Sequence, residues 1–223
     1  MENMDSIALV GSSGHAKVVI DIVEKEGRCA IAGLIDAFRS VGEETLGYRV
    51  LGAEGDLPGL RAEYGLKGVI VAIGDNAVRA RVAAQVAAIC SELPFVSAVH
   101  PGASIGRDVA LGAGTVVMAG AVVNPGCRVG RFCIVNTKAS LDHDCVMEEF
   151  SSLAPGVTVG GACRIGSYSA VSIGAVLRHS IAIGEHCVIG AGSTVLQDVE
   201  SFAVAYGTPA RKVRNRQAGE KYL

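Results

Sequence analysis

Aliphatic residues recur at every sixth position through the second half of the chain. The series starts at Ile105 and ends at Val195, and it has no break. Three hexads make an 18-residue coil of three short strands, so the repeat predicts about five coils of a triangular prism with the aliphatic side chains inside. Glycine or asparagine often follows the aliphatic residue, where we expect a corner with positive φ or a close approach. Because the phase has no insertion, any loop at a site must come from the N-terminal half or the C-terminal tail.

The first hundred residues have a different pattern, in which apolar strands alternate with amphipathic helices. We expect strands at residues 6–11, 29–36, 68–74 and 94–100, and helices at residues 15–27 and 77–90. This order predicts an α/β domain with a parallel sheet flanked by helices. Ligands of such sheets bind beyond the carboxyl ends of the strands, where GSSGH (11–15), Asp36 and Gly74-Asp75-Asn76 would converge.

Composition narrows the function classes. The net charge of −2 gives no reason to expect nucleic acid or an anionic membrane as a partner. No apolar run approaches the ~18 residues of a membrane span, and no signal peptide is evident, so we expect a cytoplasmic protein. Five of the seven cysteines (127, 133, 145, 163 and 187) share one small, inward-facing phase of the hexads. We therefore interpret them as core residues rather than metal ligands.

Four motifs in order carry a resemblance that covers essentially the whole chain. They are VGSSGHAKVV (10–19), AIGDN (72–76), NT…DHDC (136–145) and GTPAR (207–211). Together they resemble the bacterial sugar O- and N-acetyltransferases of the hexapeptide-repeat acyltransferases. This family includes sialic acid O-acetyltransferases and N-acetyltransferases of nucleotide-linked 4-amino-4,6-dideoxy sugars. The resemblance implies a Rossmann-like domain (1–100), a left-handed parallel β-helix (101–206) and a C-terminal tail (207–223).

The same resemblance implies the ligands and their sites. The nucleotide sugar, UDP- or GDP-linked, would bind the first domain, with its pyrophosphate at Ser13, Gly14 and His15 and its nucleoside at Asp36, Gly74 and Asn76. Asn136 would lie near the sugar, unless it only satisfies a corner. Acetyl-CoA would lie along the β-helix between subunits of a homotrimer. Its expected contacts are Ser152, Ile173, Gly174, Ala191, Gly192, Arg211 and Lys212.

His143 is the candidate catalytic base. The attacking amine must lose a proton before or during attack on the thioester, and a histidine near its ordinary pKa can accept that proton at neutral pH. Asp144 could hold the other ring nitrogen and thereby raise the basicity of the imidazole. The resemblance places the family's catalytic histidine in this segment. We interpret Asp142 as a structural residue at a corner, where aspartate tolerates a strained φ.

Three alternatives remain open. The base could activate a hydroxyl of a sialic-acid-like sugar, or the protein could be a non-catalytic trimer that binds a nucleotide sugar. Zinc hydratases also use β-helix trimers, but His179 and His186 lie seven residues apart and therefore outside the six-residue phase, so we expect no metal. Many relatives have a second histidine where this chain has Ser152, which puts a two-histidine mechanism in doubt.

Overall fold

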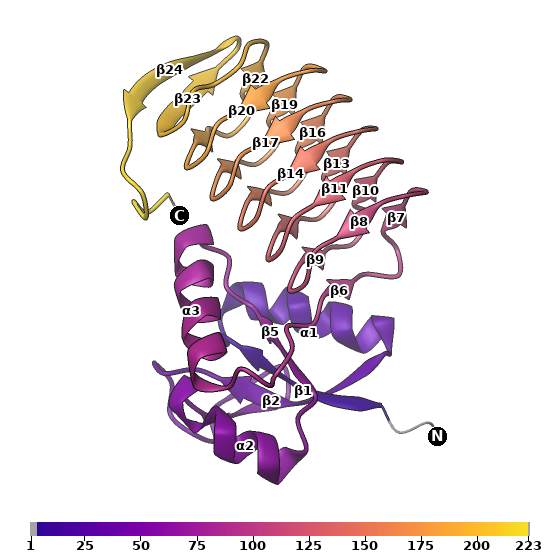
Figure 1. Cartoon of the computed structure of the whole chain (residues 1–223), viewed down its shortest axis with the longest axis vertical. Coiled ribbons are helices and arrows are strands. Elements are labelled where there is room, and N and C mark those ends of the chain that lie inside the picture. The colour runs from indigo at the N-terminus through magenta and orange to yellow at the C-terminus, as the bar shows by residue number, and fades with distance from the viewer. Residues whose placement is uncertain (1–3, 223) are drawn as a thin grey trace. The chain divides into compact units, whose positions relative to one another are not determined.

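The computed structural model describes residues 4–222, which form two compact units. The first contains residues up to Gly74 and Val78–Pro101, and the second contains Asp75–Ala77 and the chain from Gly102 onward. Figure 1 shows the α/β elements in indigo to magenta and the repetitive strands in pink to yellow.

A sheet with the strand order β3-β4-β2-β1-β5 forms the centre of the first unit. Strands β1 (Asp5–Val10), β2 (Cys29–Ile35), β4 (Tyr48–Gly52) and β5 (Gly68–Val71) run parallel, and β3 (Glu44–Thr45) pairs antiparallel with β4. The chain passes from β1 to β2 and then to β4 on one side of β1, and it returns through a helix to β5 on the other side. The gap between β1 and β5 is therefore a topological switch point, where parallel sheets commonly bind ligands.

Three α-helices accompany this sheet: α1 (Gly14–Glu26), α2 (Leu57–Tyr64) and α3 (Asn76–Ile89). Helix α1 buries Ala16, Val19, Ile20, Ile22 and Val23, and it ends at Gly27, which has a φ of 67°. The predicted strands at 6–11, 29–36 and 68–74 and both predicted helices are confirmed, with ends that differ by a few residues. The hairpin β3–β4, the 3₁₀ turn η1 (Glu54–Asp56) and α2 lie in a segment without a clear periodic signal.

The predicted strand at residues 94–100 is only partly correct. Phe95 forms an isolated parallel bridge with Val69 of β5, and the assigned strand, β6, contains only Ala98–Val99. Pro94 lies in this segment and lacks a backbone N–H. The extended segment is therefore shorter and less regular than the apolar pattern suggested.

Two-residue strands stacked in three parallel sheets form the second unit, as Figure 1 shows for β7 to β22. Strands pair with the strand 18 residues later, as in Val123↔Leu141 and Leu141↔Val159. Face 1 contains β7 (Ser104–Ile105), β10 (Val122–Val123), β13 (Ser140–Leu141), β16 (Thr158–Val159), β19 (Val176–Leu177) and β22 (Thr194–Val195). Face 2 contains β8 (Ala110–Leu111), β11 (Arg128–Val129), β14 (Val146–Met147), β17 (Arg164–Ile165) and β20 (Ala182–Ile183).

Face 3 contains β9 (Val116–Val117), β12 (Ile134–Val135), β15 (Ser152–Leu153), β18 (Ala170–Val171), β21 (Val188–Ile189) and β23 (Ala203–Gly207). The predicted prism is confirmed, and its interior contains the aliphatic series from Val117 to Val195 together with the five hexad cysteines, all buried. In the first coil, Ile105 is exposed and Leu111 is half-buried, so the expectation that every hexad buries its aliphatic residue is wrong there. Residues beyond 207 continue as β24 (Ala210–Asn215), which pairs antiparallel with β23.

The corners correct one detail of the prediction. The positive φ angles fall three residues after the aliphatic position, not one, and include Asp144 at 59°. Asp142, which directly follows Leu141, has no positive φ, so its predicted strained conformation is wrong. Glycine directly after an aliphatic residue serves a close approach instead. A Cβ on Gly112 would lie 2.5 Å from the backbone nitrogen of Arg131 in the next coil.

Each edge of the prism has its own column of side chains. We call the edge between faces 1 and 2, which contains His143 and Asp144, the histidine corner. The edge between faces 2 and 3 is the aromatic corner, where the rings of Phe132, Phe150, Tyr168, His186 and Phe202 stack 4.6–5.3 Å apart. The edge between faces 3 and 1 is the glycine corner, which contains Gly120, Gly156, Gly174 and Gly192. Within residues 4–222, no helix is both long enough and apolar enough to cross a bilayer.

Candidate functional site

His143 and Asp144 form a hydrogen-bonded pair on the outside of the histidine corner. The ring nitrogen Nδ1 of His143 lies 2.8 Å from Oδ2 of Asp144, and both side chains are more than half exposed. Because an ionised carboxylate only accepts hydrogen bonds, Nδ1 carries the proton in the neutral imidazole. The opposite nitrogen, Nε2, is then left with a free lone pair that can take a proton.

Glycines in the two neighbouring coils leave space for this pair. A Cβ on Gly161, one coil after His143, would lie 2.6 Å from Nε2 of the imidazole. A Cβ on Gly126, one coil before Asp144, would lie 2.6 Å from Oδ1 of its carboxylate. Both distances are shorter than a van der Waals contact, so a side chain at either position would displace the pair.

Asp142 holds the backbone of the same turn. Its Oδ1 accepts the backbone N–H of His143 at 2.9 Å and the side-chain amide of Asn124, one coil earlier, also at 2.9 Å. The hydrogen bond from the N–H of His143, followed by that from Asn124, lowers the pKa of the Asp142 carboxyl. Asp142 therefore acts as an acceptor that orients the segment carrying the histidine.

The surroundings of His143 favour its charged form. The hydrogen bond to Asp144, followed by the charge of Asp142, raises the pKa of the imidazole above its ordinary value. A more basic imidazole takes a proton from a substrate more readily, provided that it starts neutral. The corner thus has the geometry and the electrostatics of a general base with an orienting carboxylate.

A pocket of about 440 Å³ lies in the first unit at the carboxyl ends of its strands. Its lining comes from the loop after β1, from Asp36 and Phe38 after β2, from Glu54 of η1 and from Arg81 of α3. All lining residues belong to the first unit. This is the switch point between β1 and β5, as the strand order predicts.

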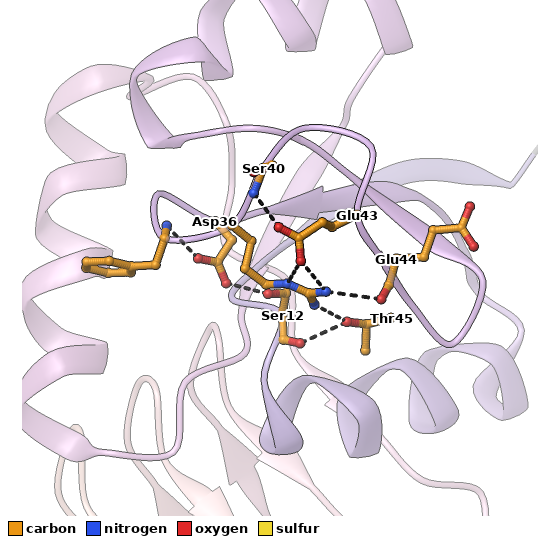
Figure 2. A network of polar contacts seen from close by, with 8 residues as sticks. Ser12, Asp36, Ser40, Glu43, Glu44 and Thr45 are labelled. Carbon is orange, nitrogen blue, oxygen red and sulfur yellow. Dashed lines mark hydrogen bonds and ion pairs between the residues drawn. The ribbon is translucent and has the colours of Figure 1, made fainter.

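A network of hydrogen bonds fixes Asp36 in this pocket (Figure 2). The Ser12 hydroxyl donates to Oδ2 of Asp36 at 2.5 Å, and the backbone N–H of Phe38 donates to Oδ1 at 2.9 Å. The Thr45 hydroxyl donates to the carbonyl oxygen of Ser12 at 3.0 Å, and Arg39 donates to that hydroxyl at 2.7 Å. Asp36 is thereby held in one orientation before any ligand arrives.

Glu43 completes the network in Figure 2. Its carboxylate forms an ion pair with Arg39 at 2.8 Å and accepts the backbone N–H of Ser40 at 2.8 Å. The hydrogen bond from Ser40, followed by that from Arg39, lowers the pKa of Glu43. The loop after β2 is therefore a built structure and not an open connection.

The N-terminus of α1 lies next to the same pocket. Ser13 is the N-cap residue, but its side chain makes no capping hydrogen bond, and the first turn of the helix contains no acidic residue. The first N–H groups of a helix attract anions, so this end can receive a phosphate group. Ser13 lines the pocket, and Gly14 next to it is exposed.

His15 follows in the first turn of α1 and is neutral at ordinary pH. Burial, followed by the charge of Arg79, lowers its pKa to about 4. Its Nε2 is buried and has no hydrogen-bond partner among the described residues. Arg79 is itself buried and donates to the carbonyl oxygens of Ile73 and Gly74 at 3.0 and 2.8 Å, which fixes the turn after β5.

Asn76, which the family resemblance assigned to a nucleoside pocket, has backbone partners. It is 1% exposed, and its side-chain amide donates to the carbonyl oxygen of Ser169 at 3.1 Å. It is not among the residues that line the 440 Å³ pocket, whereas Asp36 and Ser13 are. A role of Asn76 in nucleoside binding stays a prediction.

The residues predicted to contact acetyl-CoA lie away from the histidine corner. Ile173 and Gly174 at the glycine corner lie one coil before Ala191 and Gly192, and Ile173 is exposed. Ser152 lies on face 3, in β15. On β24, Arg211 is exposed and Lys212 forms an ion pair with Glu200; both line a second pocket of about 300 Å³.

Two further predicted positions can also be placed. Asn136 lies at the glycine corner, and its Oδ1 accepts the backbone N–H of Thr137 at 2.8 Å, as a corner residue would. His179 lies at the histidine corner, two coils after His143, whereas His186 lies in the aromatic stack. In the described part of the chain, no group of three or more His, Cys, Asp or Glu side chains could hold a metal ion.

Several residues of these sites were not found from the sequence. Arg39, Glu54 and Arg81 line the pocket, and Gly161 adjoins His143. The 18-residue period could have identified Gly161, because it places position 161 directly above position 143. No pattern in the sequence marks Glu54.

Comparisons with known proteins agree with these two units. The model of the PglD N-terminal domain matches residues 6–86, and the model of the bacterial transferase hexapeptide (six repeats) matches residues 162–197. A UDP-N-acetylbacillosamine N-acetyltransferase of Bacillus subtilis is 30% identical over 117 residues, which are 52% of each chain. The match thus spans about half the length of that curated relative.

Solved structures extend the similarity to nearly the whole chain. A histidine-to-asparagine variant of perosamine N-acetyltransferase from Caulobacter crescentus, in complex with CoA and GDP-perosamine, is 32% identical with a TM-score of 0.89; the match covers 96% of this chain and 99% of that one. The acetyltransferase domain of PglB from Neisseria gonorrhoeae, in complex with acetyl coenzyme A, is 31% identical with a TM-score of 0.87, covering 95% and 100%. The chain therefore belongs to the bacterial sugar acetyltransferase family of the hexapeptide-repeat acyltransferases, with an N-terminal α/β domain and a left-handed parallel β-helix.

Proposed function

We propose that this protein transfers an acetyl group from acetyl-CoA to the amino group of a nucleotide-linked 4-amino-4,6-dideoxy sugar. The observation that carries the proposal is the pair of His143 and Asp144, in which Nδ1 is bound to a carboxylate at 2.8 Å and Nε2 is left to accept a proton. Relatives that match nearly the whole chain were solved with CoA and GDP-perosamine or with acetyl coenzyme A. Family membership and the geometry of the corner support the same chemistry.

The reaction proceeds by direct attack in a ternary complex. The sugar nitrogen attacks the thioester carbonyl carbon while Nε2 of His143 takes a proton from that nitrogen. The tetrahedral intermediate then collapses, the carbon–sulfur bond breaks, and the imidazolium returns the proton to the CoA sulfur. Asp144 keeps the proton on Nδ1 and stabilises the imidazolium that forms. The site needs no metal for these steps.

The proposed active form is the homotrimer that the resemblance implies, and the positions of the predicted contacts on one chain support an assembly of more than one copy. His143 lies at the histidine corner, whereas Ile173, Gly174, Ala191 and Gly192 lie at the glycine corner. Two different edges of one rigid prism cannot face each other, so a second copy must supply the CoA contacts. Arg211 on β24 is exposed and can bind a CoA phosphate, whereas Lys212 would have to exchange its ion pair with Glu200 for one.

The cytoplasm is the proposed location. All seven cysteines are free, which suits a reducing compartment. The substrate is a UDP- or GDP-linked sugar, bound with its diphosphate at the N-terminus of α1 and its nucleoside beside Asp36.

A release assay for CoA thiol tests the proposal. Purified protein receives acetyl-CoA with UDP- or GDP-linked 4-amino-4,6-dideoxy sugars, and the product is identified by mass spectrometry. We expect thiol release that requires the amino sugar and yields an amide. An ester product, or release with a sialic-acid-like acceptor only, would favour O-acetylation. Nucleotide-sugar binding without thiol release would favour a non-catalytic binding protein.

A further inference from the structure

Phe38 is an aromatic side chain exposed at the edge of the 440 Å³ pocket. It is 97% exposed, whereas Phe132 and Phe150, which stack on each other at the aromatic corner, are buried. Its backbone is held in place, since its N–H donates to Asp36. An uncovered ring on an anchored stretch of backbone at a pocket offers a stacking surface for another flat, apolar ring.

Glu54 supplies an unpaired carboxylate in the same pocket. The residue is only 8% exposed, yet its side chain makes no hydrogen bond or ion pair with any residue in 4–222. A largely buried carboxylate is normally paired, because removing its charge from water is unfavourable. The two oxygens of Glu54 are therefore available to accept hydrogen bonds from a ligand.

Asp36, unlike Glu54, already accepts hydrogen bonds from the protein. Each of its oxygens accepts one protein donor, from Ser12 and from the N–H of Phe38. A carboxylate held at the end of the second strand of a parallel sheet is well placed for a ribose hydroxyl. This leaves Glu54 and Phe38 to meet the part of the ligand beyond the ribose, which is the base.

From these contacts, and resting on the proposed function, we infer that the nucleotide of the sugar substrate carries guanine. Guanine presents two adjacent donors, N1–H and the N2 amino group, which match the two oxygens of one carboxylate. Uracil presents a single N–H between two carbonyl oxygens. If one carboxylate oxygen accepts that N–H, the other faces a carbonyl oxygen, and the two oxygens repel each other. Adenine and cytosine place an acceptor beside their amino group. Phe38 stacks on the face of the guanine while Glu54 reads its edge.

Nucleoside diphosphates test the inference by calorimetric titration of the full-length protein. We expect GDP to bind more tightly than IDP, which lacks the N2 amino group, by about ten- to a hundred-fold, the usual effect of a hydrogen bond to a charged group. UDP and ADP should bind more weakly than IDP. UDP binding as tightly as GDP would overturn the inference.

Two variants test the roles of Glu54 and Phe38 in binding the base. Glu54→Gln keeps one acceptor and loses the other, so the preference for GDP over IDP should fall toward one. Phe38→Ala should weaken GDP and IDP equally, by about ten-fold, because stacking does not depend on the amino group. Glu63→Gln, the same change at an exposed position outside the pocket, is the control and should change nothing. An unaltered ratio of GDP to IDP in Glu54→Gln would overturn the role of Glu54.

The thiol-release assay separates this inference from the proposed function. Turnover with a UDP-linked amino sugar and none with its GDP-linked counterpart would refute guanine but leave the acetyltransferase proposal intact. Tight GDP binding without turnover on any amino sugar would leave the guanine site standing and refute the proposed function.

Discussion

Gly161 provides the space that the imidazole of His143 occupies. The two residues lie one coil apart on the same column, and a Cβ on Gly161 would lie 2.6 Å from Nε2, the nitrogen with the free lone pair. Gly112, by contrast, makes room for backbone, whereas Gly126 makes room for the carboxylate of Asp144. Gly161 makes room for a side chain, and that side chain is the proposed base.

Gly161→Ala should therefore impair catalysis without unfolding the protein. The backbone φ of Gly161 is not positive, and the exposed imidazole can swing aside, so the melting temperature should change little. A base displaced by about 1 Å can lower kcat by roughly 100-fold. Steady-state kinetics and thermal melting measure the two effects. Gly59→Ala is the control, because a Cβ there meets nothing within 4 Å. Unaltered kcat in Gly161→Ala would contradict the assigned position of the base.

His143→Ala should abolish most turnover and leave both substrates bound. A general base contributes about 10²–10⁴-fold to the rate, and the exposed side chain contributes little to the fold. Titration calorimetry with CoA and with the nucleotide should give dissociation constants close to those of the wild type. Near-normal turnover in this variant would refute His143 as the base.

Asp144→Asn should shift the pH dependence of kcat to lower pH. Asp144 raises the pKa of His143, and the base works only when neutral, so activity falls as the pH drops through that raised pKa. Removing the carboxylate lowers the pKa of His143, and the acid limb of the pH profile of kcat then moves to lower pH. Asparagine tolerates the positive φ at this position, so the backbone is retained. An acid limb that does not move would indicate that another group, such as the sugar amine, controls it.

Ser12→Ala should weaken nucleotide binding through Asp36. Ser12 is 3% exposed, and its hydroxyl donates to Oδ2 of Asp36. Loss of a hydrogen bond to a carboxylate costs about 1.5–3 kcal/mol, part of which should appear as a higher Kd for GDP or UDP. Ser91→Ala, at an exposed serine outside the pocket, is the comparison. Equal effects of the two substitutions would show that the network does not orient Asp36 for binding.

His15 should make the fold less stable in acid. Its pKa is about 4 in the folded protein and about 6.5 when unfolded. Between these values the unfolded chain binds the proton and the folded chain does not, so stability decreases as the pH falls from 6.5 to 4, by roughly 3 kcal/mol. Urea denaturation at pH 7 and pH 4 should show this loss in the wild type and a smaller one in His15→Asn. Equal losses would mean that His15 is not buried in its neutral form.

The prism could be predicted from the sequence because burial alone determines its period. From Val117 to Val195 each hexad buries one aliphatic side chain, as Leu141 and Leu153 show. The left-handed backbone at the corners could not be predicted in the same way. That position contains Asp144, Phe150 and Tyr168 as well as glycines, because the stacked coils impose the conformation on whatever residue is there. The glycines that directly follow the aliphatic residues therefore led to the wrong prediction of which residue of the turn has a positive φ.

The α/β unit shows a second limit. Ser13, Asp36 and Gly74 could be expected at strand ends, since apolar runs mark those ends. Glu54 belongs to a three-residue 3₁₀ turn, and Thr45 to a two-residue strand, and neither is long enough to have a period. The position of Glu54 in the pocket, and that of Thr45 in the network that supports it, arise from the tertiary path of the chain.

The stacked coils also set the distances between sites along the axis of the β-helix in regular steps. Parallel strands lie about 4.8 Å apart, so Gln197, three coils after His143 on the same column, lies about 14 Å along the axis. Insertion or deletion of one whole coil would change the separation between the base and the C-terminal hairpin by one such step and leave every corner in phase. In this fold, the distance between the base and the C-terminal hairpin can therefore change only by whole coils. The direction in which the base points stays constant.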